Sequence, residues 1–262
     1  MLSRETLIEA IERSDAMLPE VPGYNQYVRL PGVLLCVSPT NEPHANKALL
    51  ARLDSSNVDI GIERALEHFG ALNKCFSWIV GPNSTPSDLS DRLTKRGFEM
   101  MLGADGLCLP DLNPSIAVND AVRIIELSPD DLEPAVHISA VGFGSSVDDS
   151  RVFHKLIALS APAVITRTYV AFLDGVSHPV ACGYTTYFHD QPIALLCGGA
   201  TLPEYRRQGV YRTMLAHRLA DIRRDGIDSV VVLADQRTSS PICIKNGFEK
   251  LCELRFHIWQ PR

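Results

Sequence analysis

Three arginines gather in one short polar segment, Arg206 to Arg212, which lies between a predicted strand and a predicted helix. The start of a helix exposes backbone N–H groups that have no internal partner, and the helix dipole adds partial positive charge there. Gly209 removes a side chain at the point where the backbone would have to approach a phosphate. The segment therefore predicts a site for an anion such as a pyrophosphate. The alternative is a solvated turn whose arginines face water.

The same segment resembles the acyl-CoA pyrophosphate loop of the GNAT acetyltransferase superfamily. That loop reads Gln or Arg, two residues, Gly, one residue, and then Gly or Ala. Arg206 matches the first position and Gly209 the central glycine, whereas Tyr211 stands where the family has a small residue. The resemblance implies acetyl-CoA as co-substrate, with its pyrophosphate bound by Arg206, Arg207, Gln208, Gly209, Val210, Tyr211 and Arg212.

The resemblance also implies where the pantetheine arm would lie. In the family, the strand before the loop and the strand after the helix splay apart, and the arm pairs with the first strand. The partners here would be the main chain of Ala200, Thr201 and Leu202. Gln236 and Ser239 would lie on the other side, where the family tends to carry Asn and a small residue. Gln236 is equally explained as a polar turn residue.

Acetyl transfer to an amine requires a neutral amine, a polarised thioester carbonyl and a proton for the departing thiolate. Many GNAT proteins supply that proton from a tyrosine four residues before a Gly-Phe pair. This chain has Cys243 at that position before Gly247-Phe248. A thiol can protonate a thiolate or accept an acetyl group. The alternative is that Cys243 is a small buried hydrophobic residue.

The strand predicted over residues 193–201 carries no acidic residue that could act as a base, so Tyr184, Tyr187 or Glu204 are possible substitutes. A thioester is already activated, and orientation with backbone polarisation can supply much of the rate. The loop around Phe143 lies between two predicted helices, a place that helps to shape the acceptor site in GNAT proteins. We expect Phe143, Tyr184 and Tyr187 to contact the acceptor; for Phe143 the alternative is an exposed loop aromatic.

The elements around these residues follow from hydrophobic patterning and turn signals. In the second half the sequence predicts a helix start at Ser128-Pro129 and a short helix before Gly247. It also predicts a long helix over 211–224 and strands over 122–127, 166–173, 179–188, 193–201, 230–234 and 248–259. The first half predicts helices over 3–17, 58–69 and 87–96 and strands over 33–37, 75–80 and 98–109.

The two halves are related by a shift of 150 residues, which lays Gly97-Phe98-Glu99 on Gly247-Phe248-Glu249. Both tripeptides follow a strand and a helix in the same order. The sequence thus predicts a tandem of mixed α/β domains with the GNAT fold, a central and mostly antiparallel mixed sheet flanked by helices. Residues 1–112 are predicted to form a truncated and degenerate domain, residues 113–120 a linker, and residues 121–262 a complete acetyl-CoA-binding domain. The first half has aspartates where the anion loop would be, so we expect it not to bind CoA.

Composition limits the possible functions. The 262 residues include 25 Lys and Arg against 31 Asp and Glu, a net charge of −6 that disfavours nucleic acid or membrane partners. Seven cysteines without a C-x-x-C pair indicate reduced thiols in a cytoplasmic protein. The eight histidines show no metal-ligand spacing, so no metal is expected.

We therefore predict an N-acetyltransferase that moves an acetyl or other small acyl group from acetyl-CoA to a primary amine by direct attack in a ternary complex. The amine would belong to a small molecule or a peptide. The alternative is a non-catalytic module that binds or senses acyl-CoA. Nothing in the sequence selects the amine or the oligomeric state.

Overall fold

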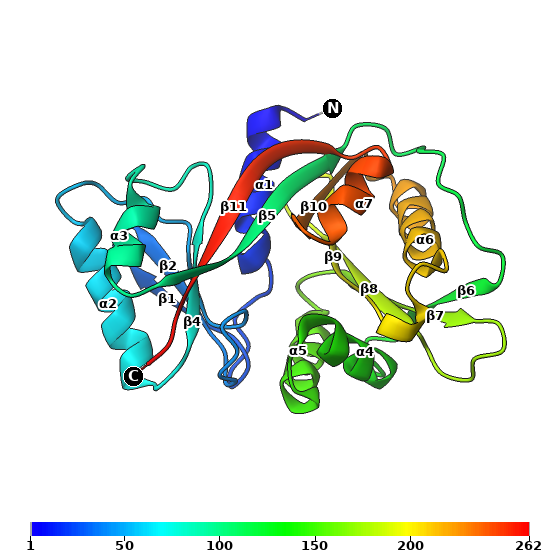
Figure 1. Cartoon of the computed structure of the whole chain (residues 1–262), viewed down its shortest axis with the longest axis horizontal. Coiled ribbons are helices and arrows are strands. Elements are labelled where there is room, and N and C mark those ends of the chain that lie inside the picture. The colour runs from blue at the N-terminus through cyan, green and yellow to red at the C-terminus, as the bar shows by residue number, and fades with distance from the viewer. Residues whose placement is uncertain (1, 262) are drawn as a thin grey trace. The chain divides into compact units, whose positions relative to one another are not determined.

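The computed structural model describes residues 2–261, apart from the side chain of Leu102 (Figure 1). Its contacts divide the chain into two compact units. The C-terminal unit comprises Leu107–Leu233 and Ile242–Glu249, and the N-terminal unit comprises Arg4–Gly106, Ala234–Pro241 and the segment that begins at Lys250. Each unit combines sheet and helices, so the predicted mixed α/β class is confirmed.

The sheet of the C-terminal unit has the strand order β10-β9-β8-β7-β6. The four strands β6 to β9 form an antiparallel meander, and β10 joins β9 in parallel. A parallel neighbour requires a crossover connection, which the helix α6 provides. The strands are β6 Val122–Leu127, β7 Thr166–Leu173, β8 Ala181–Tyr187, β9 Ile193–Thr201 and β10 Ser229–Asp235.

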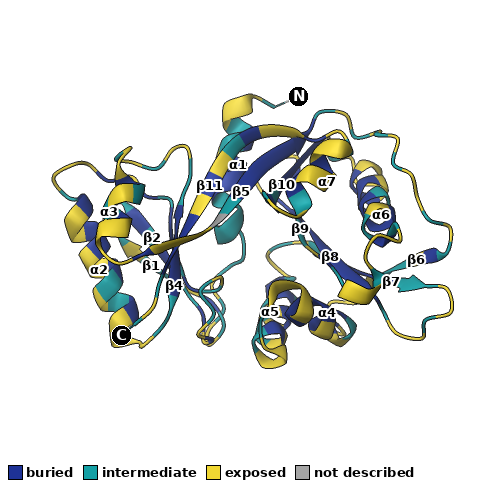
Figure 2. Cartoon of the chain, in the orientation of Figure 1, coloured by how far each residue is buried: buried dark blue, intermediate teal, exposed yellow. Residues whose placement is uncertain are grey.

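Helices cover both faces of this sheet. Because side chains alternate along a strand, neighbouring residues of β7 face opposite sides. Val170 packs in a cluster with residues of α4 and α5, whereas Tyr169 and Ala171 pack with residues of α6. The inner faces of these helices are buried and their outer faces are exposed (Figure 2). The helices are α4 Glu133–Phe143, α5 Val147–Ser160 and α6 Val210–Arg224. A further helix, α7 Ser239–Lys245, follows β10 and is divided between the two units at Pro241.

One predicted helix start is wrong. The Ser128-Pro129 signal was expected to open the helix, but α4 begins at Glu133 after an N-cap at Leu132. Ser128 instead accepts a hydrogen bond from the amide of Asp130 in the preceding turn. Pro134 occupies the first turn of α4, where its missing N–H costs nothing.

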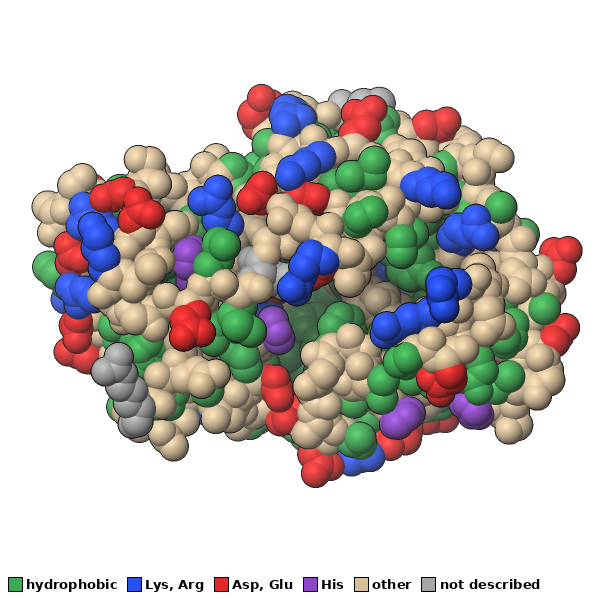
Figure 3. All heavy atoms as spheres, in the orientation of Figure 1, with side chains coloured by type: hydrophobic (Ala, Val, Ile, Leu, Met, Phe, Trp, Pro, Cys, Tyr) green, Lys and Arg blue, Asp and Glu red, His purple; other side chains and the backbone are tan. Residues whose placement is uncertain are grey.

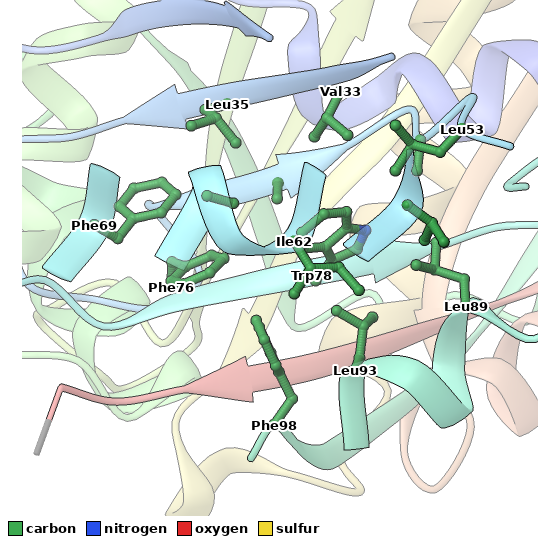
Figure 4. Packing of buried hydrophobic residues seen from close by; sticks show 14 residues of the cluster. Val33, Leu35, Leu53, Ile62, Phe69, Phe76, Trp78, Leu89, Leu93 and Phe98 are labelled. Atoms are coloured by element: carbon green, nitrogen blue, oxygen red, sulfur yellow. The ribbon is translucent and has the colours of Figure 1, made fainter. Parts of the chain in front are cut away.

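The sheet of the N-terminal unit has the order β1-β2-β3-β4-β11-β5. Its core gathers large side chains from α2, β4 and α3, among them Phe69, Phe76, Trp78 and Leu93 (Figure 4). Phe69 stacks on Phe76 with 4.2 Å between ring centroids. The strands are β1 Gln26–Leu30, β2 Val33–Val37, β3 Lys47–Leu49, β4 Phe76–Val80, β5 Glu99–Leu109 and β11 Glu249–Trp259, and the helices are α1 Arg4–Arg13, α2 Val58–Ala71 and α3 Leu89–Lys95.

The division by contacts does not follow chain order. Strand β11 pairs antiparallel with β4, from Arg255 opposite Val80 to Trp259 opposite Phe76. The C-terminal strand therefore completes the sheet of the N-terminal unit, whereas the sequence placed all of residues 121–262 in one domain. Among residues 2–261, no helix is long and apolar enough to cross a membrane.

Candidate functional site

The segment between β9 and α6 has two residues in the left-handed backbone region. After β9 ends at Thr201, a 3₁₀ turn over Pro203–Tyr205 leads into α6, with Gly209 as its N-cap. Gly209 has φ +78° and Arg207 has φ +64°. A Cβ atom at Gly209 would lie 3.2 Å from Cβ of Asn119. Both the backbone angle and this close approach therefore favour glycine at 209.

The amides at the start of α6 have no partner. The first helical hydrogen bond runs from the amide of Thr213 to the carbonyl of Gly209, at 3.0 Å. Within residues 2–261, the six amides of residues 207–212 donate no hydrogen bond. Unpaired donors at the positive end of a 15-residue helix can bind an anion.

Asn119, from the segment predicted as a linker, holds this loop in place. Its side-chain amide donates to the carbonyl of Gln208 at 2.8 Å, and its backbone amide donates to Oγ1 of Thr213 at 2.8 Å. In a trans peptide the C=O and the following N–H point in opposite directions. Because the Gln208 carbonyl points toward Asn119, the amide of Gly209 points away from it and stays available.

Exposed arginines surround the amides. Arg206, Arg207 and Arg212 are all exposed, and basic side chains gather on this face over α6 and the loop before it (Figure 3). Nε of Arg206 donates to the carbonyl of Thr201 at 3.0 Å, which fixes this arginine beside the end of β9. The loop therefore concentrates positive charge in a chain whose net charge is −6.

Strands β9 and β10 pair over the first four residues of each. Their register runs from Ile193 opposite Ser229 to Leu196 opposite Val232 and stops there. On its other edge β9 stays paired with β8 as far as Thr201, with an irregularity between Cys182 and Tyr184. The last part of β9, up to the loop, therefore has one edge that no described strand of its unit pairs with. Such an edge can bind an extended ligand.

The side chain of Tyr211 is directed toward β9 and α7. A Cβ atom at Gly199 would lie 2.9 Å from Cε2 of Tyr211. The Tyr211 hydroxyl lies 3.7 Å from Sγ of Cys243, which is 1% exposed. Burial raises the pKa of both groups. Cys243 is thus a buried thiol whose contact is a phenol.

The tyrosines proposed to contact the acceptor are buried and hydrogen-bonded. The ring of His154 must donate from Nδ1 to the carbonyl of Ser150, because a carbonyl only accepts. Burial lowers the pKa of His154, so the neutral ring accepts at Nε2 from the hydroxyl of Tyr184, at 2.7 Å. Tyr187 donates to Asp225 at 2.6 Å.

The remaining predicted residues are not all in one unit. Phe143 is the last residue of α4 and is 53% exposed. Gln236 and Ser239 belong to the N-terminal unit, where Nε2 of Gln236 donates to Asp105 at 2.9 Å. The described residues contain no cluster of three or more His, Cys, Asp or Glu that could hold a metal ion.

Two residues of this region are not among those that the sequence predicts for the site. Asn119 gives no local signal, because its partners lie about 90 residues along the chain. Arg218 is 2% exposed and lies four residues after Met214 and four before Ile222, both of which are buried. That spacing puts a charge on the buried face of α6, and it could have been noticed.

The comparison with protein families matches residues 123–250 to the model described as acetyltransferase (GNAT) domain. The match covers β6 to β10, the arginine loop and α7, in the chain order that the resemblance implied. Residues 123–250 form a GNAT domain. Membership in this family and the fold support acyl transfer as the class of activity.

Solved structures of GNAT proteins resemble the chain over nearly its whole length. A GCN5-related N-acetyltransferase from Kribbella flavida is 17% identical, with 100% of this chain and 97% of that chain covered and a TM-score of 0.71. A tandem GNAT protein from the clavulanic acid biosynthesis pathway is 13% identical, with 98% and 94% covered and a TM-score of 0.63. At these identities the likeness shows the fold alone. One of these similar structures is a tandem GNAT protein.

A third similar structure is a functionally unknown conserved protein from Staphylococcus epidermidis, 12% identical, with 92% and 96% covered and a TM-score of 0.64. No curated protein matches the chain. Any more specific activity must therefore be inferred from the residues of the site itself.

Proposed function

We propose that this GNAT domain transfers an acetyl or other small acyl group from its CoA thioester to a primary amine, by direct attack in a ternary complex. The observation that carries the proposal is the set of six unpaired amides over residues 207–212, with three exposed arginines beside them. A diphosphate would accept hydrogen bonds from these amides and ion-pair with the guanidinium groups. The N-terminus of a helix favours such a charge.

The free edge of β9 suits the pantetheine arm. The arm carries two amide groups, which would hydrogen-bond to main-chain groups in the stretch Ala200, Thr201 and Leu202 in the way a neighbouring strand does. The amide of Leu202 already donates to the carbonyl of Val180 at 2.9 Å, so the arm would use the other groups of this stretch. This arrangement would hold the thioester in the C-terminal unit while the amine attacks its carbonyl carbon. Orientation of two reactants in one complex is a large source of rate for an already activated ester.

The acceptor is proposed to be a primary amine on a small molecule or a peptide. A net charge of −6 favours the approach of a cationic amine through long-range attraction. The amine must lose a proton before or during attack, because only its neutral form is a nucleophile.

Binding and transfer are tested separately. We expect CoA and acetyl-CoA at about 100 times their Kd to raise the free energy of unfolding by about 2.7 kcal/mol, measured by thermal unfolding. Pantetheine, which lacks the diphosphate, should have a smaller effect at the same concentration. A panel of primary amines with acetyl-CoA should release free CoA thiol, measured with a thiol reagent. A chain that is not stabilised by CoA would contradict the proposal.

The second candidate function is a module that binds acyl-CoA without catalysis. It is favoured by Cys243, a buried thiol in the place where the family often has a tyrosine, and by the absence of Asp and Glu from β9. Stabilisation by CoA with no thiol release from any amine would select this function over transfer.

A further inference from the structure

Arg218 is a buried cation on the face of α6 that packs against the sheet. It is 2% exposed, and the neighbouring turns of the helix place Met214 and Ile222 on the same face. Within the described part of the chain, no carboxylate pairs with its guanidinium group. A buried charge without a counter-charge is costly unless hydrogen bonds satisfy its donors, so the acceptors of Arg218 show what it does.

The guanidinium group bonds two neighbouring strands at once. Nε donates to Oγ1 of Thr185 on β8 at 3.1 Å. Nη2 donates to the carbonyls of Tyr184 on β8 and Cys197 on β9, the latter at 3.2 Å. Tyr184 and Cys197 lie directly opposite each other in the register of the two strands. The planar fork of an arginine can bridge such a pair, whereas a lysine offers a single ammonium nitrogen.

These bonds lie at a bulge in β9. The register pairs Cys182 with Ala200 and Tyr184 with Cys197. Strand β9 therefore has two residues, Gly198 and Gly199, opposite the single Gly183 of β8. Gly198 has φ +60°, in the left-handed region. An extra residue of this kind bends a strand and interrupts its hydrogen-bond ladder.

Gly183 leaves room for the guanidinium group beside the bulge. A Cβ atom at this position would lie 3.0 Å from Nη1 of Arg218 and 2.9 Å from Sδ of Met214. A side chain there would push the guanidinium group away from the two strands. The long cation of α6 and the glycine of β8 are therefore complementary in shape.

The bulge also marks the point at which β9 leaves β10. Pairing between these strands ends at Leu196, opposite Val232, and Cys197 is the next residue of β9. Residues 198–201 stay beside β8, but no described strand of the unit pairs with their other edge. The edge proposed to bind the pantetheine arm thus begins where Arg218 bonds β9.

We propose that Arg218 is a positioning residue, which holds the bulge of β9 in the geometry that presents the free edge of residues 198–201 to the pantetheine arm. The inference rests on the proposed function. Two consecutive glycines have wide conformational freedom, so without the bonds from Arg218 this part of β9 would relax. The diphosphate loop has its own support from Asn119 and Gly209 and does not depend on these bonds.

The test separates the two parts of CoA. Calorimetry gives the Kd of the wild-type chain and of Arg218→Lys for CoA and for 3′-phospho-ADP, which keeps the diphosphate and lacks the arm. The lysine keeps the charge and loses the planar fork. We expect the Kd for CoA to rise about tenfold, as loss of one or two main-chain hydrogen bonds to the arm would cause, with the Kd for 3′-phospho-ADP changed less than about twofold.

Thiol release gives a second measurement. A displaced edge would misplace the thioester, so kcat at saturating acetyl-CoA and amine should fall about tenfold or more in Arg218→Lys. A role in fold stability alone predicts the wild-type kcat and the wild-type Kd values below the unfolding temperature, which thermal unfolding of each variant provides. Asp221→Asn is the matched control, because Asp221 is another buried charged residue of α6 and its partner Tyr169 lies on β7. It should leave kcat and both Kd values within about twofold.

Gly183→Ala acts on the same guanidinium group from the strand. Its methyl group would displace Nη1 of Arg218 without changing α6. We expect the same difference between CoA and 3′-phospho-ADP as in Arg218→Lys, and this variant decides the matter if Arg218→Lys does not fold.

The outcomes are distinct. If CoA and 3′-phospho-ADP lose affinity equally in the folded variants, or if neither does, Arg218 does not position the edge of β9, while acyl transfer by the domain stands. If the wild-type chain binds neither ligand, the proposed function fails, and the inference fails with it.

Discussion

Each of the two units contains a long helix that follows a polar loop. The backbone amides of the loop before α2 are hydrogen-bonded, whereas those of the loop before α6 are not. At the start of α2, Asp54 accepts hydrogen bonds at Oδ1 from the amides of Ser56 and Asn57, at 2.7 and 3.1 Å, and its carbonyl accepts from Val58. At the start of α6 six amides have no partner among the described residues. The turn before α2 is closed on the chain's own carboxylate, whereas the loop before α6 leaves its amides open to an anion from outside.

This difference indicates that a helix N-terminus offers amides to an external anion only where the chain leaves them unpaired. Both helices have the same backbone dipole and nearly the same length, 14 residues in α2 and 15 in α6. The residues before the two helices differ: the carboxylate of Asp54 bonds amides of the turn before α2, whereas arginines and a left-handed glycine precede α6. A diphosphate has to compete with Asp54 at α2 and competes with nothing at α6.

The largest effect is expected from Gly209→Glu, which would make α6 resemble α2. The new carboxylate would lie at the anion site, its Cβ would approach Asn119, and φ +78° disfavours a side chain. We expect the affinity for CoA to fall at least about 100-fold, about 2.8 kcal/mol, measured by calorimetry.

The matched control is Gly175→Glu, because Gly175 has φ +80° and open space around it in the same unit. It introduces the same charge and the same backbone strain away from the loop. If both variants lose CoA affinity equally, the loss at 209 comes from strain or net charge, and the assignment of the loop is wrong.

The next effect is expected from Asn119→Ala. The change removes the hydrogen bond to the Gln208 carbonyl, which is then free to turn toward the anion site. This hydrogen bond is exposed, and such a bond is worth about 1 kcal/mol at most, so we expect CoA affinity to fall up to about fivefold in calorimetry. Asn113→Ala is the control from the same linker, because its partner is Arg223 near the end of α6. Equal losses in both variants would remove Asn119 from the site.

The positions of most elements could be predicted from the sequence. The strands at Val33–Val37 and Val122–Leu127 were predicted with their observed bounds, because each is a run of β-branched and apolar residues between turn signals. The strands β1 and β3 were missed, since β1 mixes polar and apolar residues with none fully buried and β3 has three residues. The start of α4 was predicted too early, because Ser128-Pro129 gives a capping signal that the structure uses for a turn.

The site could be predicted only in part. The loop over 206–212 carries a local pattern, and its glycine and arginines can be read in chain order. Asn119 bonds to Gln208 and Thr213, which follow it in the chain by 89 and 94 positions. No local sequence pattern therefore predicts this contact. The meeting of Tyr211 with Cys243 depends in the same way on how α7 packs against α6. Roles for Cys243, Gln236 and Ser239 stay predictions.

A smaller effect is expected from Arg212→Ala. This arginine is exposed in the first turn of α6, so water and salt screen its charge. We expect CoA affinity to fall about twofold to fivefold, at most about 1 kcal/mol, and the loss to shrink as NaCl rises from 50 to about 500 mM. Arg224→Ala is the control, because Arg224 is also exposed but lies at the other end of α6. Equal, salt-independent losses would show that Arg212 acts through folding rather than through charge at the loop.

The smallest effect is expected at the start of α2, from Asp54→Asn. Hydrogen bonds from the side chain of Ser56 and from backbone amides hold the pKa of Asp54 below its usual value. Because the pKa is lower in the folded chain than in the unfolded one, the carboxylate stabilises the fold above the unfolded pKa, and the contribution disappears as the pH falls through the folded pKa. Asp54→Asn should therefore lower the midpoint of thermal unfolding slightly at pH 7, and the two midpoints should converge below about pH 4.

The same variant tests whether capping alone separates the two helix starts. Asp54→Asn takes away the charge that fills the start of α2 but brings no arginine and no left-handed glycine. We expect it to gain no affinity for CoA in calorimetry, because the asparagine oxygen still accepts from the amides and no cation lies in the Asp54–Asn57 turn. A chain carrying both Gly209→Glu and Asp54→Asn that binds CoA would place a second anion site at α2 and contradict the contrast between the two units.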